Sequence, residues 1–192
     1  GAVEAIKQTD DLELVAIFSR RDPEALNLGD SSVKAVHISK ASDYVDKIDV
    51  MLLCGGSATD LPEQTPHFAS MFNTVDSFDT HAKIPAFYET VNEAATKHRK
   101  TAIISVGWDP GLFSINRVMA DAILPNGTNY TFWGKGLSQG HSDAVRRIQG
   151  VKNGVQYTIP SDNVMERVRN GENPVLSTAD KHTRVCYVVA EE

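Results

Sequence analysis

The first half of the chain alternates short apolar runs with segments that resemble amphipathic helices. Residues 50–54 and 102–106 are almost continuously apolar, which is typical of parallel strands that helices cover on both faces. This alternation predicts an α/β domain built on a doubly wound parallel sheet. Ligands of such sheets bind beyond the carboxyl ends of the strands, so the residues that follow each strand are the candidates for function.

Two domains are expected from the order of the predicted elements. In the first part, strands are predicted at residues 12–18, 33–38, 49–54, 73–76 and 101–106, and helices at 41–47, 62–71 and 85–97. In the second part, helices are predicted at 113–124 and 142–148, strands at 129–133, 151–159 and 184–190, and a glycine-rich loop at 134–141. The second pattern is typical of an α+β domain with an antiparallel sheet. We therefore expect one domain over residues 1–111 and another over residues 112–192.

Composition limits the classes of function. The formal net charge is −6, whereas nucleic-acid binding needs a basic face, so no nucleic-acid partner is expected. No apolar run approaches the length of a membrane span, and the six histidines show no metal-ligand spacing. The two cysteines, Cys54 and Cys186, are expected to be reduced, mostly buried thiols of a cytoplasmic protein.

The run Ser19-Arg20-Arg21 follows the first predicted strand. Many dinucleotide-binding folds have an acidic residue at this position, which binds the ribose hydroxyls. Two guanidinium groups suit a ribose that carries a 2′-phosphate, because their planar donors can bind the dianion in a bidentate manner. The run therefore favours NADP over NAD as the cofactor, and a solvated charge pair is the alternative.

Small and polar residues also follow the later strands. The glycines of Gly55-Gly56-Ser57 can let the backbone approach a cofactor, or they can simply form a tight turn. Asp79 and Asp109 lie in the next two loops, where carboxylates suit an ammonium group, although either can instead cap a helix or order a turn. Trp108 is either a core anchor or a wall against a nicotinamide ring.

Several runs together resemble the meso-diaminopimelate D-dehydrogenase family. The resemblance extends over all 192 residues and rests on residues 18–21, 56–60, 106–111, 113–117, 131–134, 136–143 and 155–158 and on the region of Arg184. The most specific of these is Gly-Leu-Ser-Gln-Gly-His-Ser-Asp at 136–143. Family members begin with a strand and a glycine-rich loop and continue into more sheet, so this chain, which opens on Gly1, is expected to be a fragment.

The resemblance implies a Rossmann-type domain followed by part of an α+β substrate and dimerisation domain. It implies reversible oxidative deamination of the D-centre of meso-2,6-diaminopimelate, with NADP as hydride acceptor. The products are ammonium and L-2-amino-6-oxopimelate, which cyclises to tetrahydrodipicolinate on the route to lysine. A cytoplasmic homodimer is also implied.

The resemblance further implies roles for single residues. Ser19-Arg20-Arg21 holds the 2′-phosphate, and Thr158 and Arg184 hold the distant, L-configured end of the substrate. Asp79 and Asp109 face the reacting amino centre, and the sequence does not decide which of them transfers protons. The other implied cofactor contacts are Cys54, Gly55, Gly56, Ser57, Ser77, Phe78, Asp79, Val106, Gly107, Trp108, Asp109 and Pro110, and the other substrate contacts are Trp133, Gln139 and Gly140.

Two other functions compete with this interpretation. Another NADP-dependent dehydrogenase or reductase of an amino-acid pathway would lack the Gln139-Gly140-His141 loop and the paired aspartates. A non-catalytic NADP-binding sensor would keep Arg20 and Arg21 but would have no reason to place two carboxylates and Arg184 around one pocket. His141 is a further candidate for proton transfer or for a polar substrate contact.

Overall fold

The computed structural model describes residues 1–26, 33 and 35–191. The chain divides into two compact units, unit 1 (Gly1–Val118) and unit 2 (Met119–Glu192). The division falls within helix α4 (Leu112–Ile123). The domain boundary expected at residues 111/112 therefore stays a prediction.

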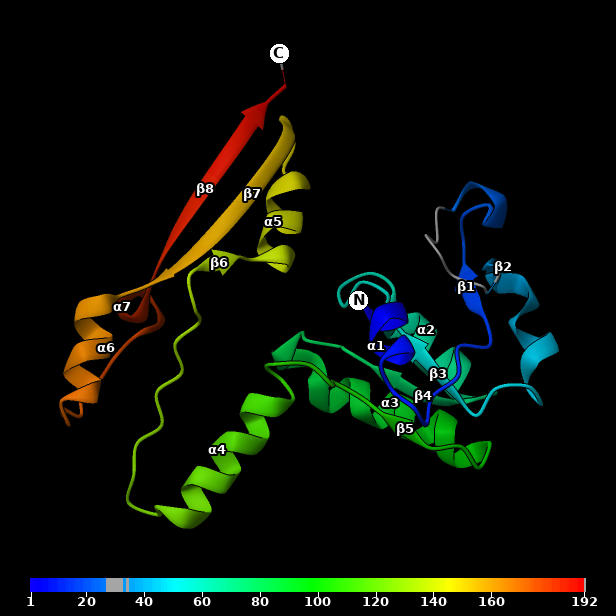
Figure 1. Cartoon of the computed structure of the whole chain (residues 1–192), viewed down its shortest axis with the longest axis horizontal. Coiled ribbons are helices and arrows are strands. Elements are labelled where there is room, and N and C mark those ends of the chain that lie inside the picture. Colours follow the sequence, from blue (N-terminus) through cyan, green and yellow to red (C-terminus); the bar gives the residue numbers. More distant parts are fainter. Residues whose placement is uncertain (27–32, 34, 192) are drawn as a thin grey trace. The chain divides into compact units, whose positions relative to one another are not determined.

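Unit 1 alternates strands and helices, and all of its strand pairs are parallel (Figure 1). Strand β1 pairs with β2, and the separate three-stranded sheet has the order β3-β4-β5. The predicted α/β architecture with parallel strands is confirmed. In chain order the elements before α4 are α1 (Ala2–Lys7), β1 (Ile17–Ser19), η1 (Pro23–Ala25), β2 (Ala35–His37), η2 (Ile38–Tyr44), β3 (Val50–Leu53), α2 (Leu61–Ala69), β4 (Asn73–Asp76), η3 (His81–Lys83), α3 (Ile84–Lys97) and β5 (Ala102–Ile103).

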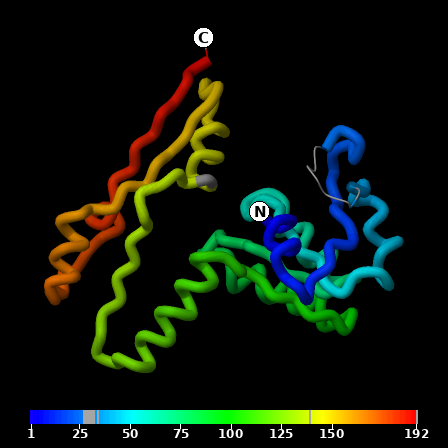
Figure 2. Tube along the Cα trace, viewed as in Figure 1, coloured from blue at the N-terminus to red at the C-terminus, as the bar shows by residue number. Residues whose placement is uncertain are grey.

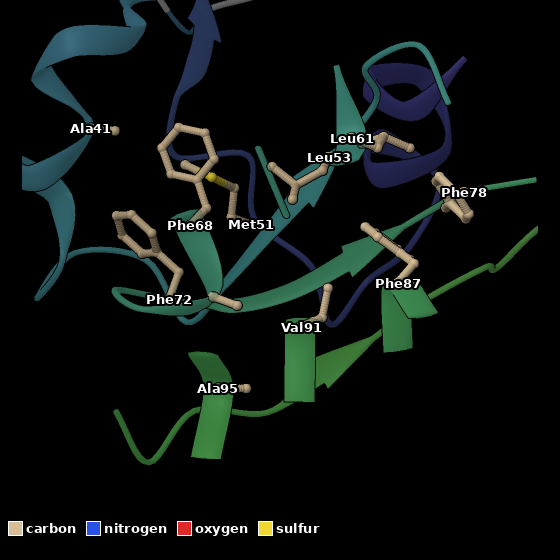
Figure 3. Close-up of a cluster of buried hydrophobic side chains, with 11 residues drawn as sticks. Ala41, Met51, Leu53, Leu61, Phe68, Phe72, Phe78, Phe87, Val91 and Ala95 are labelled. Carbon is tan, nitrogen blue, oxygen red and sulfur yellow. The ribbon is translucent and has the colours of Figure 1, made fainter. Parts of the chain in front are cut away.

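The apolar core of unit 1 forms where α2 and α3 pack on one face of the β3-β4-β5 sheet (Figure 3). Met51 and Leu53 of β3 are buried, whereas the alternate residues Val50 and Leu52 are exposed. Helices were expected on both faces of this sheet, but within the described residues they bury only one. A continuous apolar run does not reveal which face is covered, because both faces then look alike. The buried core residues are Ala41, Met51, Leu53, Leu61, Phe68, Ala69, Phe72, Phe78, Phe87, Val91 and Ala95.

Several predicted strands of unit 1 are shorter than expected. The strand predicted at 12–18 is β1 at Ile17–Ser19, because its parallel partner β2 spans only three residues, Ala35–His37. Lys34, within the strand predicted at 33–38, lies outside the described residues. The strand predicted at 101–106 ends at Ile103, because Ser105 adopts a positive φ of 62° that leaves the extended conformation. The helix predicted at 41–47 is instead the 3-10 helix η2.

Unit 2 contains an antiparallel sheet of order β6-β7-β8, which confirms the predicted α+β character. Helix α5 lies along β7 (Figure 1). Their contact is close, since a Cβ added to Gly154 of β7 would lie 2.5 Å from Cγ1 of Val145. The elements after α4 are β6 (Gly136–Leu137), α5 (Gln139–Arg146), β7 (Val151–Pro160), α6 (Asp162–Arg169), α7 (Thr178–Lys181) and β8 (His182–Ala190).

The strand predicted at 129–133 is wrong. Residues 124–135 contain neither helix nor strand and run as an irregular segment between α4 and β6 (Figure 2). The segment is held by individual hydrogen bonds and not by pairing with a neighbouring strand. The Tyr130 hydroxyl is hydrogen-bonded to Asn173 Oδ1 and to the Pro174 carbonyl, and the Trp133 N–H donates to His182 Nε2. Alternating polar and aromatic residues resemble a strand in sequence, but here their partners are two side chains and a loop carbonyl rather than the backbone of a neighbouring strand.

Cys54 and Cys186 are free thiols, as expected, but the expectation that they are buried is wrong, because both are exposed. Cys54 follows β3 at the edge of the core, and Cys186 lies on β8, an outer strand of its sheet. In the described part of the chain, no helix combines the length and apolar character needed to cross a membrane. The same residues contain no group of three or more His, Cys, Asp or Glu side chains suited to a metal ion.

Candidate functional site

The buried carboxylate of Asp76, the last residue of β4, connects the loops after two strands. Its Oδ1 accepts hydrogen bonds from the backbone N–H groups of Phe78 (3.0 Å) and Ser105 (2.9 Å). Its Oδ2 accepts from the hydroxyl of Thr65 on α2 at 2.8 Å. These donors make the burial of a carboxylate tolerable. Asp76 therefore fixes the loop after β4 against the loop after β5. No motif singled out Asp76 in the sequence, although an aspartate that ends an apolar strand is a usable signal.

The loop after β3 is joined to the loop after β4 through Ser57. Ser57 Oγ accepts a hydrogen bond from the Asp79 N–H at 2.8 Å and is hydrogen-bonded to Thr80 Oγ1 at 3.3 Å. Two of the predicted cofactor segments, 54–57 and 77–79, are thus brought together. Phe78 is an exception within its segment, because its ring is buried and stacks on Phe87 at 4.1 Å. Only its backbone is placed to contact a ligand.

Asp109 follows β5 and is held by an ion pair. Arg117, on α4, donates to both carboxylate oxygens, with Nη2–Oδ1 at 2.6 Å and Nη1–Oδ2 at 3.3 Å. His81 Nε2 lies 3.8 Å from Oδ1 of the same carboxylate. The hydrogen bonds from Arg117 lower the pKa of Asp109; partial burial opposes this, and the charges of Arg117 and His81 add to the lowering. Asp109 is therefore ionised, with a neighbouring cation balancing its charge.

Asp79 differs from Asp109 in its partners. Its side chain is exposed and makes no hydrogen bond or ion pair with any residue that the structure describes. Its carbonyl oxygen is 2.8 Å from His81 Nδ1, so His81 lies between the two aspartates. The structure thus brings both predicted carboxylates to neighbouring loops, one of them ion-paired and the other open to solvent.

The loop at 106–111 is tightly closed. Gly107 and Gly111 form an isolated bridge, and Gly111 has a positive φ of 129°. A Cβ on Gly111 would lie 2.1 Å from the Gly107 carbonyl oxygen, so only glycine fits there. Trp108 is 65% exposed, which excludes a role as a core anchor. Val106, also predicted to contact the cofactor, donates its N–H to the Asp76 carbonyl at 2.8 Å, and Pro110 follows Asp109 within the turn.

Ser19 and the two arginines leave the carboxyl end of β1. Ser19 Oγ accepts a hydrogen bond from the Arg21 N–H at 3.0 Å. Arg20 Nη1 pairs with Oδ1 of Asp60 at 2.9 Å, in the loop that follows β3. Arg20 is therefore not simply solvated, and it reaches the segment that contains Gly55 and Gly56.

Unit 2 carries the predicted substrate residues on its sheet and at the start of α5. Thr158 of β7 lies directly opposite Arg184 of β8 in the antiparallel ladder. Directly opposite residues share one face of a sheet, so the hydroxyl and the guanidinium come from adjacent positions. On its other side Thr158 pairs with Gly136 of β6.

A buried hydroxyl holds the start of α5 against β7. Ser142 is fully buried; its Oγ donates to the Ser138 carbonyl at 2.6 Å and accepts from the Gln156 N–H at 2.9 Å. Gln139 and Gly140 are the first residues of the helix, where backbone N–H groups lack intrahelical partners. His141 Nδ1 is bound to Ser138 Oγ at 2.6 Å. The helix start is thus fixed, with backbone donors available to a ligand.

Trp133 is anchored through its backbone. Its N–H donates to Nε2 of His182 at 2.8 Å, which requires an unprotonated Nε2. Burial lowers the pKa of His182 and the charges of Lys181 and Arg184 lower it further, while the contact with the Trp133 backbone opposes this, so that the net pKa is lowered. The neutral imidazole is consistent with that hydrogen bond.

The residues predicted from the sequence lie on different units. The two aspartates belong to unit 1, and the predicted residues for the distant end of the substrate belong to unit 2.

Known proteins are similar to this chain along its whole length. Residues 107–192 match the family model of the diaminopimelic acid dehydrogenase C-terminal domain. The chain is 64% identical over 192 residues to the meso-diaminopimelate D-dehydrogenase of Ureibacillus thermosphaericus, an alignment that covers 100% of this chain and 59% of that protein. The resemblance inferred from the sequence is confirmed.

Two solved structures are similar in fold. A meso-DAPDH variant with six substitutions, from Clostridium tetani E88 and solved with DAP, has a TM-score of 0.90 and 56% identity, and the alignment covers 99% of this chain and 58% of that one. An engineered D-amino acid dehydrogenase bound to NADP+ has a TM-score of 0.87 and 45% identity, covering 98% and 58%. The chain thus spans less than two thirds of the length of these relatives.

Proposed function

We propose that the chain is part of an NADP-dependent meso-diaminopimelate D-dehydrogenase. The reaction is the reversible oxidative deamination of the D-centre of meso-2,6-diaminopimelate to L-2-amino-6-oxopimelate and ammonium. The observation that carries this proposal is the 64% identity over all 192 residues to a protein of that name. The site geometry supports it, because two carboxylates lie at neighbouring strand ends. The proposal includes a cytoplasmic homodimer that acts in lysine biosynthesis.

The residues of unit 1 fit NADP. Arg20 presents a guanidinium that is 65% exposed beside the Gly55–Ser57 loop, and a guanidinium matches a phosphate dianion in charge and shape. In the proposal Ser19, Arg20 and Arg21 hold the 2′-phosphate. Segments 54–57, 77–79 and 106–110 line the remainder of the cofactor, and exposed Trp108 lies against the nicotinamide. Bound NADP accepts the hydride that leaves the D-carbon.

We assign proton transfer to Asp79 and ammonium anchoring to Asp109. Arg117 lowers the pKa of Asp109, which makes that carboxylate a weak base. The Asp79 carboxylate has no such partner among the described residues and is open to solvent. The substrate ammonium first loses a proton to give the amine, and departure of hydride from the D-carbon then leaves an iminium. Both carboxylates stabilise this cation. Asp79 takes a proton from the attacking water and passes it to the nitrogen of the resulting carbinolamine, which collapses to the carbonyl as the nitrogen leaves and takes up the hydroxyl proton to form ammonium.

Unit 2 supplies the groups for the other end of the substrate. In the proposal, the Thr158 hydroxyl and the Arg184 guanidinium bind the L-configured carboxylate, supported by their opposite positions in the β7-β8 ladder. The Clostridium tetani variant solved with DAP carries a Thr→Ile and an Arg→Met substitution as far apart in its sequence as Thr158 and Arg184 are here. The proposal also assigns Trp133, Gln139 and Gly140 to binding of the substrate.

An isomer assay on the full-length protein tests the proposal. NADPH formation is followed with meso-, L,L- and D,D-diaminopimelate as substrates. We expect steady turnover with the meso isomer and little with the others, because one end must be D for reaction and the other L for binding. Turnover of another amino-acid-pathway substrate alone would favour a different dehydrogenase. NADP binding without any turnover would favour a sensor.

A further inference from the structure

We propose that Asp60 is a positioning residue for cofactor selectivity. Its carboxylate holds the Arg20 guanidinium beside the Gly55–Ser57 loop, in the orientation that receives the 2′-phosphate of NADP. This inference rests on the proposed function in one respect, namely that Arg20 binds that phosphate.

The side chain of Asp60 is turned away from its own helix. Asp60 is the N-cap residue of α2, where an aspartate usually accepts a hydrogen bond from a backbone N–H of the first helical turn. Its side chain makes no such bond. Instead, Oδ2 accepts from the Gly56 N–H at 2.9 Å, and Oδ1 pairs with Arg20 Nη1 at 2.9 Å. One carboxylate thus connects two segments that are both assigned to the cofactor.

The loop fits closely around this carboxylate. A Cβ on Gly55 would lie 2.8 Å from the Asp60 Cβ and 2.7 Å from Gln64 Oε1, and a Cβ on Gly56 would lie 3.0 Å from Thr59 Oγ1. A Cβ on Gly55 would thus clash with Asp60, whereas one on Gly56 would need the Thr59 hydroxyl to shift, so the glycines let the loop wrap closely onto Asp60. The Asp60 side chain is only 17% exposed, whereas that of Arg20 is 65% exposed. The fixed partner is therefore the aspartate, and the arginine is oriented by it.

Asp60 affects NADP binding in two opposite ways: it orients the Arg20 side chain, which favours binding, and its negative charge repels the phosphate. We expect the first effect to be the larger one. A long arginine side chain loses rotamer entropy when it binds a ligand, and the ion pair with Asp60 restricts it beforehand. Only one of the five guanidinium N–H donors is needed for a contact to Asp60, so the others can bind phosphate. The Gly56 N–H and the positive end of the α2 dipole compensate the charge of Asp60.

The test uses the full-length protein without substrate and compares Asp60→Asn with the wild type. Asparagine keeps the size of the side chain, the N-cap preference and an acceptor for the Gly56 N–H, but it removes the charge that holds Arg20. The dissociation constants of NADP and NAD are measured by calorimetry. We expect NADP to bind roughly two- to five-fold more weakly, the range for an exposed ion pair, and NAD to bind as before. Asp46→Asn, an exposed aspartate between η2 and β3, is the matched control for net charge.

A double variant completes the test. With Arg20 replaced by alanine, Asp60→Asn should cause no further loss of NADP affinity, because its effect acts through Arg20. Equal weakening of both cofactors, tighter NADP binding, or a further loss in the Arg20→Ala background would each overturn the inference. If Asp60→Asn does not fold, as judged by thermal melting, Asp60→Ser replaces it. The wild-type preference for NADP over NAD tests the proposed function separately, because it does not depend on Asp60.

Discussion

Unit 1 and unit 2 hold their candidate residues in different ways. In unit 1 the aspartates lie on loops, and buried polar side chains such as Asp76 connect these loops across the strand ends. In unit 2 Thr158 and Arg184 lie within strands, and ladder register alone makes them neighbours. Under the proposed function we infer a division of work: unit 1 supplies the chemistry, which depends on exact loop positions, and unit 2 supplies substrate recognition from a regular sheet.

The two units also differ in what they bury. The buried apolar residues that the structure describes all fall between Ala41 and Ala95, in unit 1. In the described part of unit 2, the buried polar side chains are those of Ser142 and Gln156. Unit 1 is therefore organised around an apolar core, whereas the junction of α5 and β7 in unit 2 depends on the hydrogen bonds of the buried Ser142 hydroxyl.

Replacement of Asp79 tests the chemical role of unit 1 and should have the largest effect. Asp79→Asn removes the proposed proton-transfer group while keeping the loop contacts made by its backbone. We expect kcat to fall by roughly 10²- to 10⁴-fold with an unchanged melting temperature. Asp109→Asn is the matched variant and should reduce kcat less. A larger loss for Asp109→Asn would reverse the two assignments.

Removal of the arginines tests the cofactor side of unit 1. Arg20→Ala with Arg21→Ala should weaken NADP binding by roughly 1.5–3 kcal/mol for each charge-assisted contact that is lost. NAD binding should be nearly unaffected, because NAD carries no 2′-phosphate. The measurement is a titration of the full-length protein with each cofactor. Equal losses for NADP and NAD would restore the interpretation of the arginines as a surface charge pair.

Ser142→Ala tests whether unit 2 depends on buried hydrogen bonds. The substitution leaves the buried Gln156 N–H without its acceptor. The expected loss in the free energy of unfolding is about 1–3 kcal/mol, measured by denaturant titration. Ser42→Ala, at an exposed serine of η2, is the control and should change stability little. If Ser142→Ala leaves the free energy of unfolding unchanged, unit 2 does not depend on this buried hydroxyl, and the contrast with the apolar core of unit 1 is wrong.

The smallest expected effect concerns pH and the Asp109–Arg117 pair. Because the folded pKa of Asp109 lies below its ordinary value of 3.8, the ion pair contributes stability above that pH and loses it as the pH falls toward the folded pKa. Arg117→Gln should therefore flatten the loss of stability below about pH 4. Unfolding curves at pH 7 and pH 3 give the difference between the two proteins. An identical acid dependence would show that the pair does not act as described.

Sequence patterns predicted the elements that carry their own periodicity. The strand predicted at 73–76 is β4, and the helix predicted at 85–97 differs from α3 by one residue, because apolar spacing marks both. The strands that carry Thr158 and Arg184 were predictable because both residues lie in long strand-like runs, whereas the register that places them opposite each other was not predicted. Helices α6 and α7 were missed, although Ser177 and Asp180 form a capping box at the start of α7 that the spacing could have revealed.

Contacts between distant segments were not predictable. Asp76, Asp60 and Arg117 act through hydrogen bonds to residues of other loops and helices, and no local pattern encodes such partners. The segment at 129–133 was mispredicted for the same reason, namely that its partners are distant in sequence. Its composition suits a strand, but Trp133 finds its partner in the His182 side chain rather than in a ladder.

The most direct test of this division of work removes the two residues of unit 2 that are proposed to bind the distant substrate carboxylate, Thr158 and Arg184, and compares the turnover of two kinds of substrate. Arg184→Met with Thr158→Ile is assayed in the full-length protein with meso-diaminopimelate and with D-amino acids that carry apolar side chains. The account predicts a sharp fall in turnover of meso-diaminopimelate and a gain of activity on the apolar D-amino acids, because the chemistry of unit 1 remains intact. Full meso-diaminopimelate turnover by the double variant would contradict the account and would place the carboxylate clamp elsewhere.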